Sequence, residues 1–183
     1  MERTALIVVD WQNDYFEGGK MPLNGAEAAA RQAHRLQAGF RAAGLPVFNV
    51  RHETLREPAP FFAPGTEGAE IHPLLAPAEG EAVITKNFPN SFRGTDLLER
   101  LQAQGVETLV IAGAMTHMCI DATTRAAADL GFRCRLAQDA CATRDLEFGG
   151  VAVPAAQVHA AFLAGLSGIY ADIRPTEELL PAA

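Results

Sequence analysis

The feature that most constrains the fold is the alternation of short apolar runs with longer segments of helical periodicity. Residues Thr4–Asp10, TALIVVD, form a continuous run rich in β-branched residues that ends in an acid. Such a run is typical of a buried strand in a parallel sheet. Further strands are predicted at Pro46–Arg51, Ala82–Lys86, Thr108–Gly113, Arg133–Gln138 and Ile169–Ile173.

Helical segments separate these strands. Between Gly25 and Ala43 apolar residues recur at steps of four and three, which places them on one face of a helix that Gly44 ends. Further helices are predicted at Thr95–Gln104 (with Thr95 as N-cap), Cys119–Leu130 and Pro154–Leu166. The alternation predicts the α/β class, with a mostly parallel sheet and helices on both faces. With no internal repeat or linker, we expect one domain over residues 1–183.

The segment from His52 to Gly80 interrupts this pattern. It is rich in proline and carries no clear strand or long helix. Compact domains rarely keep such a loop without a reason. Two interpretations stay open: a loop that wraps over the surface, or one that forms a pocket wall or a subunit contact.

Composition excludes several classes of protein. Of the 183 residues 49% are hydrophobic, enough for a core, and the formal net charge is −7. An acidic chain argues against a nucleic-acid-binding face and against a polybasic membrane surface. There is no apolar run long enough to cross a bilayer and no signal-peptide pattern. The three cysteines fit a reducing compartment, so we expect a cytoplasmic protein.

Three polar residues stand where apolar strands end. Asp10 closes the first predicted strand, Lys86 closes the third, and Cys119 follows the fourth at the start of a helix. In an open parallel sheet the carboxyl ends of the strands share one edge, and ligands bind there. The topology therefore offers a place where these three residues meet.

Their chemistry is complementary. A thiol attacks as thiolate, and we expect a helix N-terminus and a nearby ammonium to lower its pKa. A carboxylate accepts the thiol proton and returns it to a leaving amine, while backbone N–H groups between Met115 and Cys119 stabilise an oxyanion. Each residue also has a purely structural interpretation. Cys119 fits a small core residue, Asp10 fits the cap of a turn, and Lys86 fits a solvated strand end. Only a structural role is predicted for the other two cysteines, Cys134 in a strand and Cys141 in the following loop.

Five stretches of the sequence resemble the isochorismatase-like cysteine hydrolase superfamily, and together they span nearly the whole chain. They are LIVVDWQNDYF (6–16), PGTEGAEIHPLL (64–75), ITKNFPNSFRGTDL (84–97), LVIAGAMTHMCIDATTRAAADLGF (109–132) and QDACATRD (138–145). The resemblance implies a three-layer α/β/α fold with six mostly parallel strands. It also implies a catalytic triad of Asp10, Lys86 and Cys119, and a cis peptide at Ala114–Met115 that aims the Met115 N–H, with that of Cys119, into an oxyanion hole.

Two departures from relatives sharpen the prediction. Nicotinamidases of this superfamily bind a metal through an Asp-x-His pair and a later His, but here Val50 stands where the Asp is needed and the later His position falls near Phe61. A metal site needs about three protein ligands, so we predict no metal and no other cofactor. True isochorismatases cleave a vinyl ether and lack the cysteine, whereas Cys119 is present.

The resemblance therefore implies a cysteine hydrolase, an amidohydrolase that cleaves a C–N bond of a small amide, ureide or lactam through a thioester. The alternatives are an isochorismatase-type ether hydrolase, a thiol redox protein and a catalytically silent binding protein. We expect a homodimer or homotetramer acting on a small molecule, with no nucleic-acid or membrane partner. Residues near the predicted edge are candidates for substrate contact: Trp11, Phe16, Arg51, His52, Ser91, Phe92 and Thr116.

Overall fold

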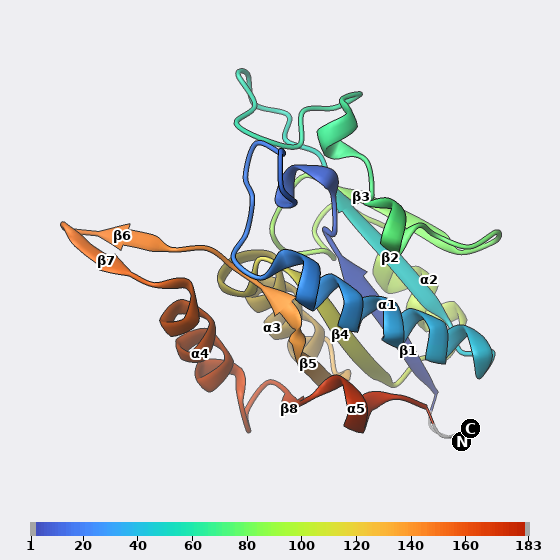
Figure 1. Cartoon of the computed structure of the whole chain (residues 1–183). Helices are drawn as coiled ribbons and strands as arrows, with labels where there is room; N and C mark the ends of the chain where they lie inside the picture. The colour runs from blue at the N-terminus through green and yellow to red at the C-terminus, as the bar shows by residue number, and fades with distance from the viewer. Residues whose placement is uncertain (1–2, 182–183) are drawn as a thin grey trace.

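The computed structural model describes residues 3–181 and is built around a six-stranded sheet (Figure 1). Across the sheet the strands are β3 (Ala82–Lys86), β2 (Val47–His52), β1 (Thr4–Val9), β4 (Thr108–Ala114), β5 (Arg133–Ala142) and β8 (Asp172–Arg174). All neighbouring strands of this sheet run parallel. The predicted α/β class with a six-stranded sheet is confirmed.

Helices cover both faces of the sheet. The helices are α1 (Ala26–Ala42), α2 (Leu97–Ala103), α3 (Asp121–Asp129), α4 (Ala155–Leu166) and α5 (Thr176–Leu179). Buried residues of α1 and α5 share one apolar cluster with Leu6 and Val8 of β1. Those of α2, α3 and α4 share the other cluster with Ala5, Ile7 and Val9. Strand β1 is therefore apolar at every position after its first because both of its faces are covered. No helix within residues 3–181 has the length and apolar character needed to cross a membrane.

Several predicted boundaries need correction. Strand β5 continues to Ala142, so Cys141 lies in the strand and not in the following loop. The last strand of the sheet, β8, begins three residues later than the predicted Ile169. The segment predicted as one helix from Cys119 is a π-helical turn, Thr116–Ile120, followed by α3. Helix α2 begins at Leu97, and Asp96 rather than Thr95 stands at its N-cap position.

A β-hairpin was missed altogether. Strands β6 (Leu146–Phe148) and β7 (Val151–Val153) pair antiparallel and project from the body of the molecule (Figure 1). Gly149 and Gly150 join them, both at positive φ. A Gly-Gly pair between short apolar runs is a hairpin signal, so this element was within reach of sequence reasoning.

The proline-rich segment after β2 packs against the rest of the domain. Phe62 and Leu75 are fully buried within it. Asp14 Oδ2 accepts a hydrogen bond of 2.7 Å from the Phe62 N–H, and Ile71 forms an isolated bridge with Gln12. The segment is therefore fixed to the loop that follows β1.

Gly113 lets two strands approach closely at the edge where the predicted site lies. It pairs with Val9, the last residue of β1, and its φ of +148° is one that other residues rarely adopt. A Cβ at this position would lie 2.2 Å from the Val9 carbonyl oxygen. Any side chain here would push β4 away from β1.

We therefore predict that Gly113→Ala lowers the free energy of unfolding by about 3 kcal/mol or more, because overpacking and an unfavourable φ add together. Gly94→Ala is the matched control: its φ is +70° and its Cβ would meet nothing within 4 Å, so about 1 kcal/mol is expected. Urea denaturation measures both. Equal losses in the two variants would contradict the close approach.

Candidate active site

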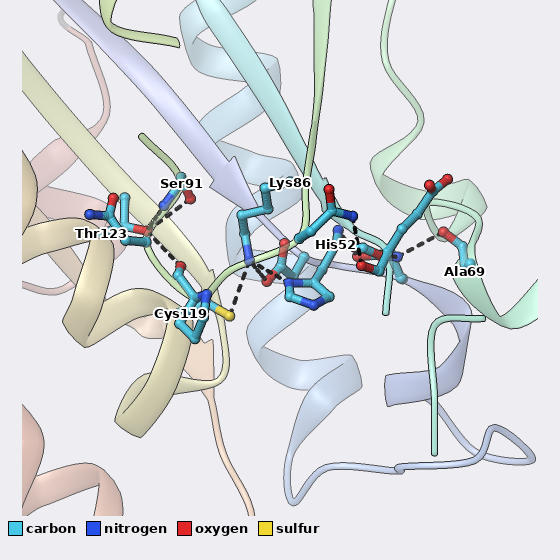
Figure 2. Close-up of polar contacts among 12 residues, drawn as sticks. His52, Ala69, Lys86, Ser91, Cys119 and Thr123 are labelled. Atoms are coloured by element: carbon cyan, nitrogen blue, oxygen red, sulfur yellow. Dashed lines mark hydrogen bonds and ion pairs between the residues drawn. The ribbon is translucent and has the colours of Figure 1, made fainter. Parts of the chain in front are cut away.

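Four polar side chains from four strand ends meet at the carboxyl edge of the sheet. Asp10 follows β1, His52 ends β2, Lys86 ends β3, and Cys119 lies in the π-helical turn after β4. Figure 2 shows Lys86 between Cys119 and His52. Strand order reverses between β1 and β4, so the site lies at the switch point where open α/β sheets bind ligands.

Lys86 is the centre of this group. Its Nζ lies 2.7 Å from Asp10 Oδ2, 3.0 Å from His52 Nδ1 and 3.2 Å from Cys119 Sγ. An ammonium has three hydrogens to donate, and these are three acceptors. The side chains of Lys86 and Asp10 are fully buried. Burial by itself would lower the pKa of Lys86, but the adjacent Asp10 carboxylate and the hydrogen bonds to Asp10 and Cys119 raise it above its usual value, so the ammonium stays charged.

Asp10 is held in an uncommon backbone conformation. Its φ is +56°, in the left-handed region, and its N–H donates to the Val50 carbonyl at 2.9 Å. Asp is one of the few residues that tolerate this region. In the described part of the chain, Asp10 Oδ1 is buried without a hydrogen-bond partner, so one carboxylate oxygen is free to accept a proton.

Burial raises the pKa of the Cys119 thiol, and the neighbouring Asp10 charge raises it further. Lys86 opposes both effects but only in part. The expectation of a lowered thiol pKa is therefore wrong for the resting site, where the sulfur is protonated. Burial in the core also raises the pKa of Cys134 and of Cys141 to about 12.

His52 is a neutral acceptor in this arrangement. Burial and the Lys86 charge lower its pKa to about 4, against an opposing effect of Asp10. Gln12 fixes the backbone of His52: its Nε2 donates to the His52 and Ala69 carbonyls at 2.8 and 2.7 Å, and its Oε1 accepts from the His52 N–H at 2.7 Å. His52 therefore orients Lys86, a role that the sequence did not reveal.

Asp10, His52 and Cys119 are also the one group in residues 3–181 whose side-chain atoms lie close enough to share a metal ion, within 4.8 Å of one another. All three contact Lys86 Nζ, at 2.7 to 3.2 Å. The Lys86 ammonium is therefore the positive charge that these three groups surround in this structure.

A cavity of about 490 Å³ opens beside the Cys119 sulfur, a size that suits a small ligand. The proline-rich segment supplies part of its wall, which answers the open question about that loop in favour of a pocket wall. The peptide bond between Ala114 and Met115 is cis, and Met115 faces the same cavity. The lining residues are Tyr15, His52, Thr54, Arg56, Pro60, Phe61, Asn87, Pro89, Met115, Met118, Cys119 and Arg144.

Of the residues expected to contact substrate, only His52 lines this cavity. Trp11 and Phe16 belong to the apolar core, and the Phe16 ring stacks on His72. Arg51 pairs with Glu53 at 3.1 Å and Glu70 at 3.4 Å.

The other three expected contacts also have partners within the fold. Ser91 is buried and shares a hydrogen bond of 2.8 Å with Thr123, next to Phe92, which stacks on Phe132. Thr116 Oγ1 donates to the Ala142 carbonyl at 3.2 Å. Sequence position near the sheet edge does not determine on which side of a loop a side chain lies.

Sequence reasoning missed Tyr15, Met118 and Arg144 as cavity residues. All three lie within stretches that carried the family resemblance, and Arg144 stands in QDACATRD, which received no functional assignment. The position of these three residues in family-like stretches is the sequence signal that could have identified them.

The chain matches known proteins along nearly all of its length. A family model described as Isochorismatase domain matches residues 4–174. The isochorismatase family protein YddQ of Bacillus subtilis is 51% identical over 177 residues, which cover 97% of this chain and 98% of the relative. A solved structure from Oleispira antarctica, named for the isochorismatase hydrolases, has a TM-score of 0.94 at 58% identity and covers 98% of this chain and 96% of its own.

More distant relatives have names that state an activity. Maleamate amidohydrolase of Pseudomonas putida is 34% identical over 148 residues, 72% of this chain and 68% of the relative. Streptothricin hydrolase of Streptomyces noursei is 35% identical over 142 residues, 78% of this chain and 50% of the relative. N-carbamoylsarcosine amidase of an Arthrobacter species is 30% identical over 148 residues, 72% and 56% respectively.

The lowered pKa of His52 gives a prediction for stability against pH. The unfolded chain takes up a proton on this ring near pH 6.5, but the folded chain does so only near pH 4. Stability is therefore lost as pH falls through this window. We expect roughly 1–2 kcal/mol of this loss between pH 7 and pH 4.5, allowing for the partial exposure of the ring.

His52→Gln should remove that part of the pH dependence, whereas His34→Gln, at an exposed site on α1, should leave it intact. Urea midpoints at the two pH values, converted to free energies of unfolding, measure the difference. If His52→Gln and the wild type lost stability in parallel, the protonation state assigned to His52 would be wrong.

Proposed function

The chain belongs to the isochorismatase family of hydrolases, and we propose that it cleaves the C–N bond of a small amide or ureide with Cys119 as nucleophile. The observation that carries the proposal is the contact of one ammonium, Lys86, with both the thiol and a carboxylate, beside a cavity of ligand size. Ether hydrolysis needs no sulfur at this position. The relatives named for amide cleavage support the C–N bond as the target.

Asp10 acts first as a general base. The sulfur is protonated at rest, and Asp10 Oδ1 is an acceptor without a partner. Transfer of the thiol proton to Asp10 converts a carboxylate and a thiol into a carboxylic acid and a thiolate. The negative charge moves from an oxygen 2.7 Å from Lys86 Nζ to a sulfur 3.2 Å from it. The buried net charge does not change, so the transfer avoids a new desolvation penalty.

The thiolate then attacks the carbonyl carbon of the substrate. A C–S bond forms, and the carbonyl oxygen takes up negative charge, which the N–H groups of Met115 and Cys119 stabilise. The C–N bond breaks while Asp10 returns its proton to the leaving nitrogen, which leaves a thioester on Cys119. Asp10 next accepts a proton from water, the resulting hydroxide attacks the thioester, and the acid departs as the proton returns to sulfur.

This scheme predicts that Cys119→Ala lowers kcat at least about 1,000-fold, because no other group in the site forms the covalent intermediate. Cys134→Ala is the control: it removes a thiol that is equally buried, 6% against 4% exposed, but lies outside the cavity. Its kcat should stay within about threefold of wild type. Ammonia and amine release from a panel of small amides, ureides and lactams measures both.

Turnover that survives in Cys119→Ala would contradict the covalent mechanism. Release of an alcohol or enol from ether compounds, with no nitrogen release from the panel, would favour the ether-cleaving alternative. Far-UV circular dichroism on each variant separates a lost reaction from a lost fold.

A further inference from the structure

One ring nitrogen of His52 has no role in the proposed reaction. The other, Nδ1, lies 3.0 Å from Lys86 Nζ. An ammonium can only donate, so Nδ1 offers its lone pair, and this contact assigns the tautomer. Burial and the Lys86 charge keep the ring neutral, with a pKa of about 4. The single proton of the neutral ring is therefore on Nε2, and His52 has no free lone pair with which to act as a base.

The Nε2–H group of this ring has no acceptor within the fold. Nε2 makes no hydrogen bond with any of residues 3–181 and is not sealed inside the protein. The ring lines the cavity beside the Cys119 sulfur. Lys86 holds its Nδ1, and Gln12 holds its backbone on both the N–H and the carbonyl side. The cavity wall therefore presents a fixed, neutral donor that only solvent or a ligand can satisfy.

This donor lies close to both groups that act in thioester hydrolysis. One side-chain atom from each of Asp10, His52 and Cys119 lies within 4.8 Å of those of the other two. Polar groups that are near each other but not in direct contact are often bridged by one water. A water beside the carbon bound to the Cys119 sulfur is therefore within reach of the carboxylate and of the imidazole.

The attacking water is the reactant that best fits a neutral donor here. The substrate oxyanion already has two backbone N–H groups, and the leaving nitrogen receives its proton from Asp10. In the hydrolytic step one hydrogen of the water goes to Asp10 and one lone pair attacks the thioester. The second lone pair is left to accept a hydrogen bond. A neutral N–H orients the water but withdraws less charge from it than a cation does.

We propose that the Nε2–H group of His52 holds the water that hydrolyses the thioester on Cys119. The water donates to Asp10 and accepts from Nε2–H, so two contacts fix its direction of attack. As Asp10 takes the proton, the new C–O bond forms. The C–S bond then breaks, and the sulfur recovers the proton from Asp10, which yields a free acid and a thiol. The inference rests on the proposed function for the thioester, but not for the kind of bond that is cleaved to form it.

Two substitutions separate this role from the contact with Lys86. In His52→Asn the side-chain oxygen replaces Nδ1 as the acceptor for Lys86, and the Nε2–H group is lost. In His52→Gln the amide N–H replaces Nε2–H, and the acceptor at Nδ1 is lost. His72→Asn is the matched control, because His72 Nδ1 also accepts a hydrogen bond, from the Leu74 N–H at 3.3 Å, but the residue lies outside the cavity.

The acyl donor p-nitrophenyl acetate tests the proposal and needs no amide substrate. The burst of nitrophenolate measures acetylation of Cys119, and intact-protein mass spectrometry follows the decay of the acetyl-enzyme. His52→Asn should leave the burst rate within about threefold of wild type and slow the decay roughly 10- to 100-fold. His52→Gln should slow the burst more than the decay, and His72→Asn should change neither.

Hydroxylamine separates a lost water from a distorted site. It attacks a thioester without the bound water, so it should remove the acetyl group from wild type and from His52→Asn at rates within about threefold of each other. An acetyl-enzyme of His52→Asn that resists hydroxylamine as strongly as it resists water would indicate a blocked site and overturn the proposal. An unchanged decay, or a burst that slows as much as the decay, would overturn it too.

The same measurements distinguish this inference from the proposed function. If the decay slows as expected but no amide, ureide or lactam of the panel is cleaved, the C–N assignment fails and the water site stands. If amides are cleaved but the decay in His52→Asn is unchanged, the proposed function stands and the water site is wrong. If no acetyl group forms on Cys119 of the wild type, there is no thioester to hydrolyse, and both fail.

Discussion

The ion pair between Lys86 and Asp10 is the interaction on which the site depends. Both side chains are fully buried, and their charged atoms lie 2.7 Å apart. Removing either partner of such a pair leaves an uncompensated buried charge and costs about 3–5 kcal/mol. Replacing both by apolar residues of similar volume is often neutral or stabilising. The stability of the fold therefore does not require a charged pair at this position. This points to a chemical role for Asp10 and Lys86.

The parallel sheet makes this pair possible. Asp10, His52 and Lys86 end three neighbouring strands, and Cys119 follows a fourth, so side chains far apart in sequence meet at one edge. Gly113 lets β4 approach β1 closely beside the strand end that carries Asp10. Two of the three acceptors around the Lys86 ammonium, Asp10 and Cys119, are buried, and His52 is half-buried. In the proposed reaction a proton moves between Asp10 and Cys119 without changing the net buried charge.

The sequence predicted the parts that follow from strand periodicity. The apolar run ending at Asp10 and the polar ends of two further strands placed three residues at the same edge, and the sheet that carries them is confirmed. The sequence did not predict the protonated thiol, because its pKa depends on how deeply neighbouring segments bury Cys119. It also did not separate Arg51, which pairs with acids, from Arg144, which faces the cavity. Such differences depend on how the loops pack around the strand ends, which carries no periodic signal in the sequence.

The central claim is that Cys119 carries the acyl group of the substrate during turnover. The most direct measurement is acid quenching of wild-type enzyme within milliseconds of mixing with excess hydrolysable amide, followed by intact-protein mass spectrometry and peptide mapping. The account predicts a mass increase equal to the acyl part of that substrate, located on the peptide that contains Cys119. An unmodified protein during measured turnover, or an adduct on another residue, would contradict it.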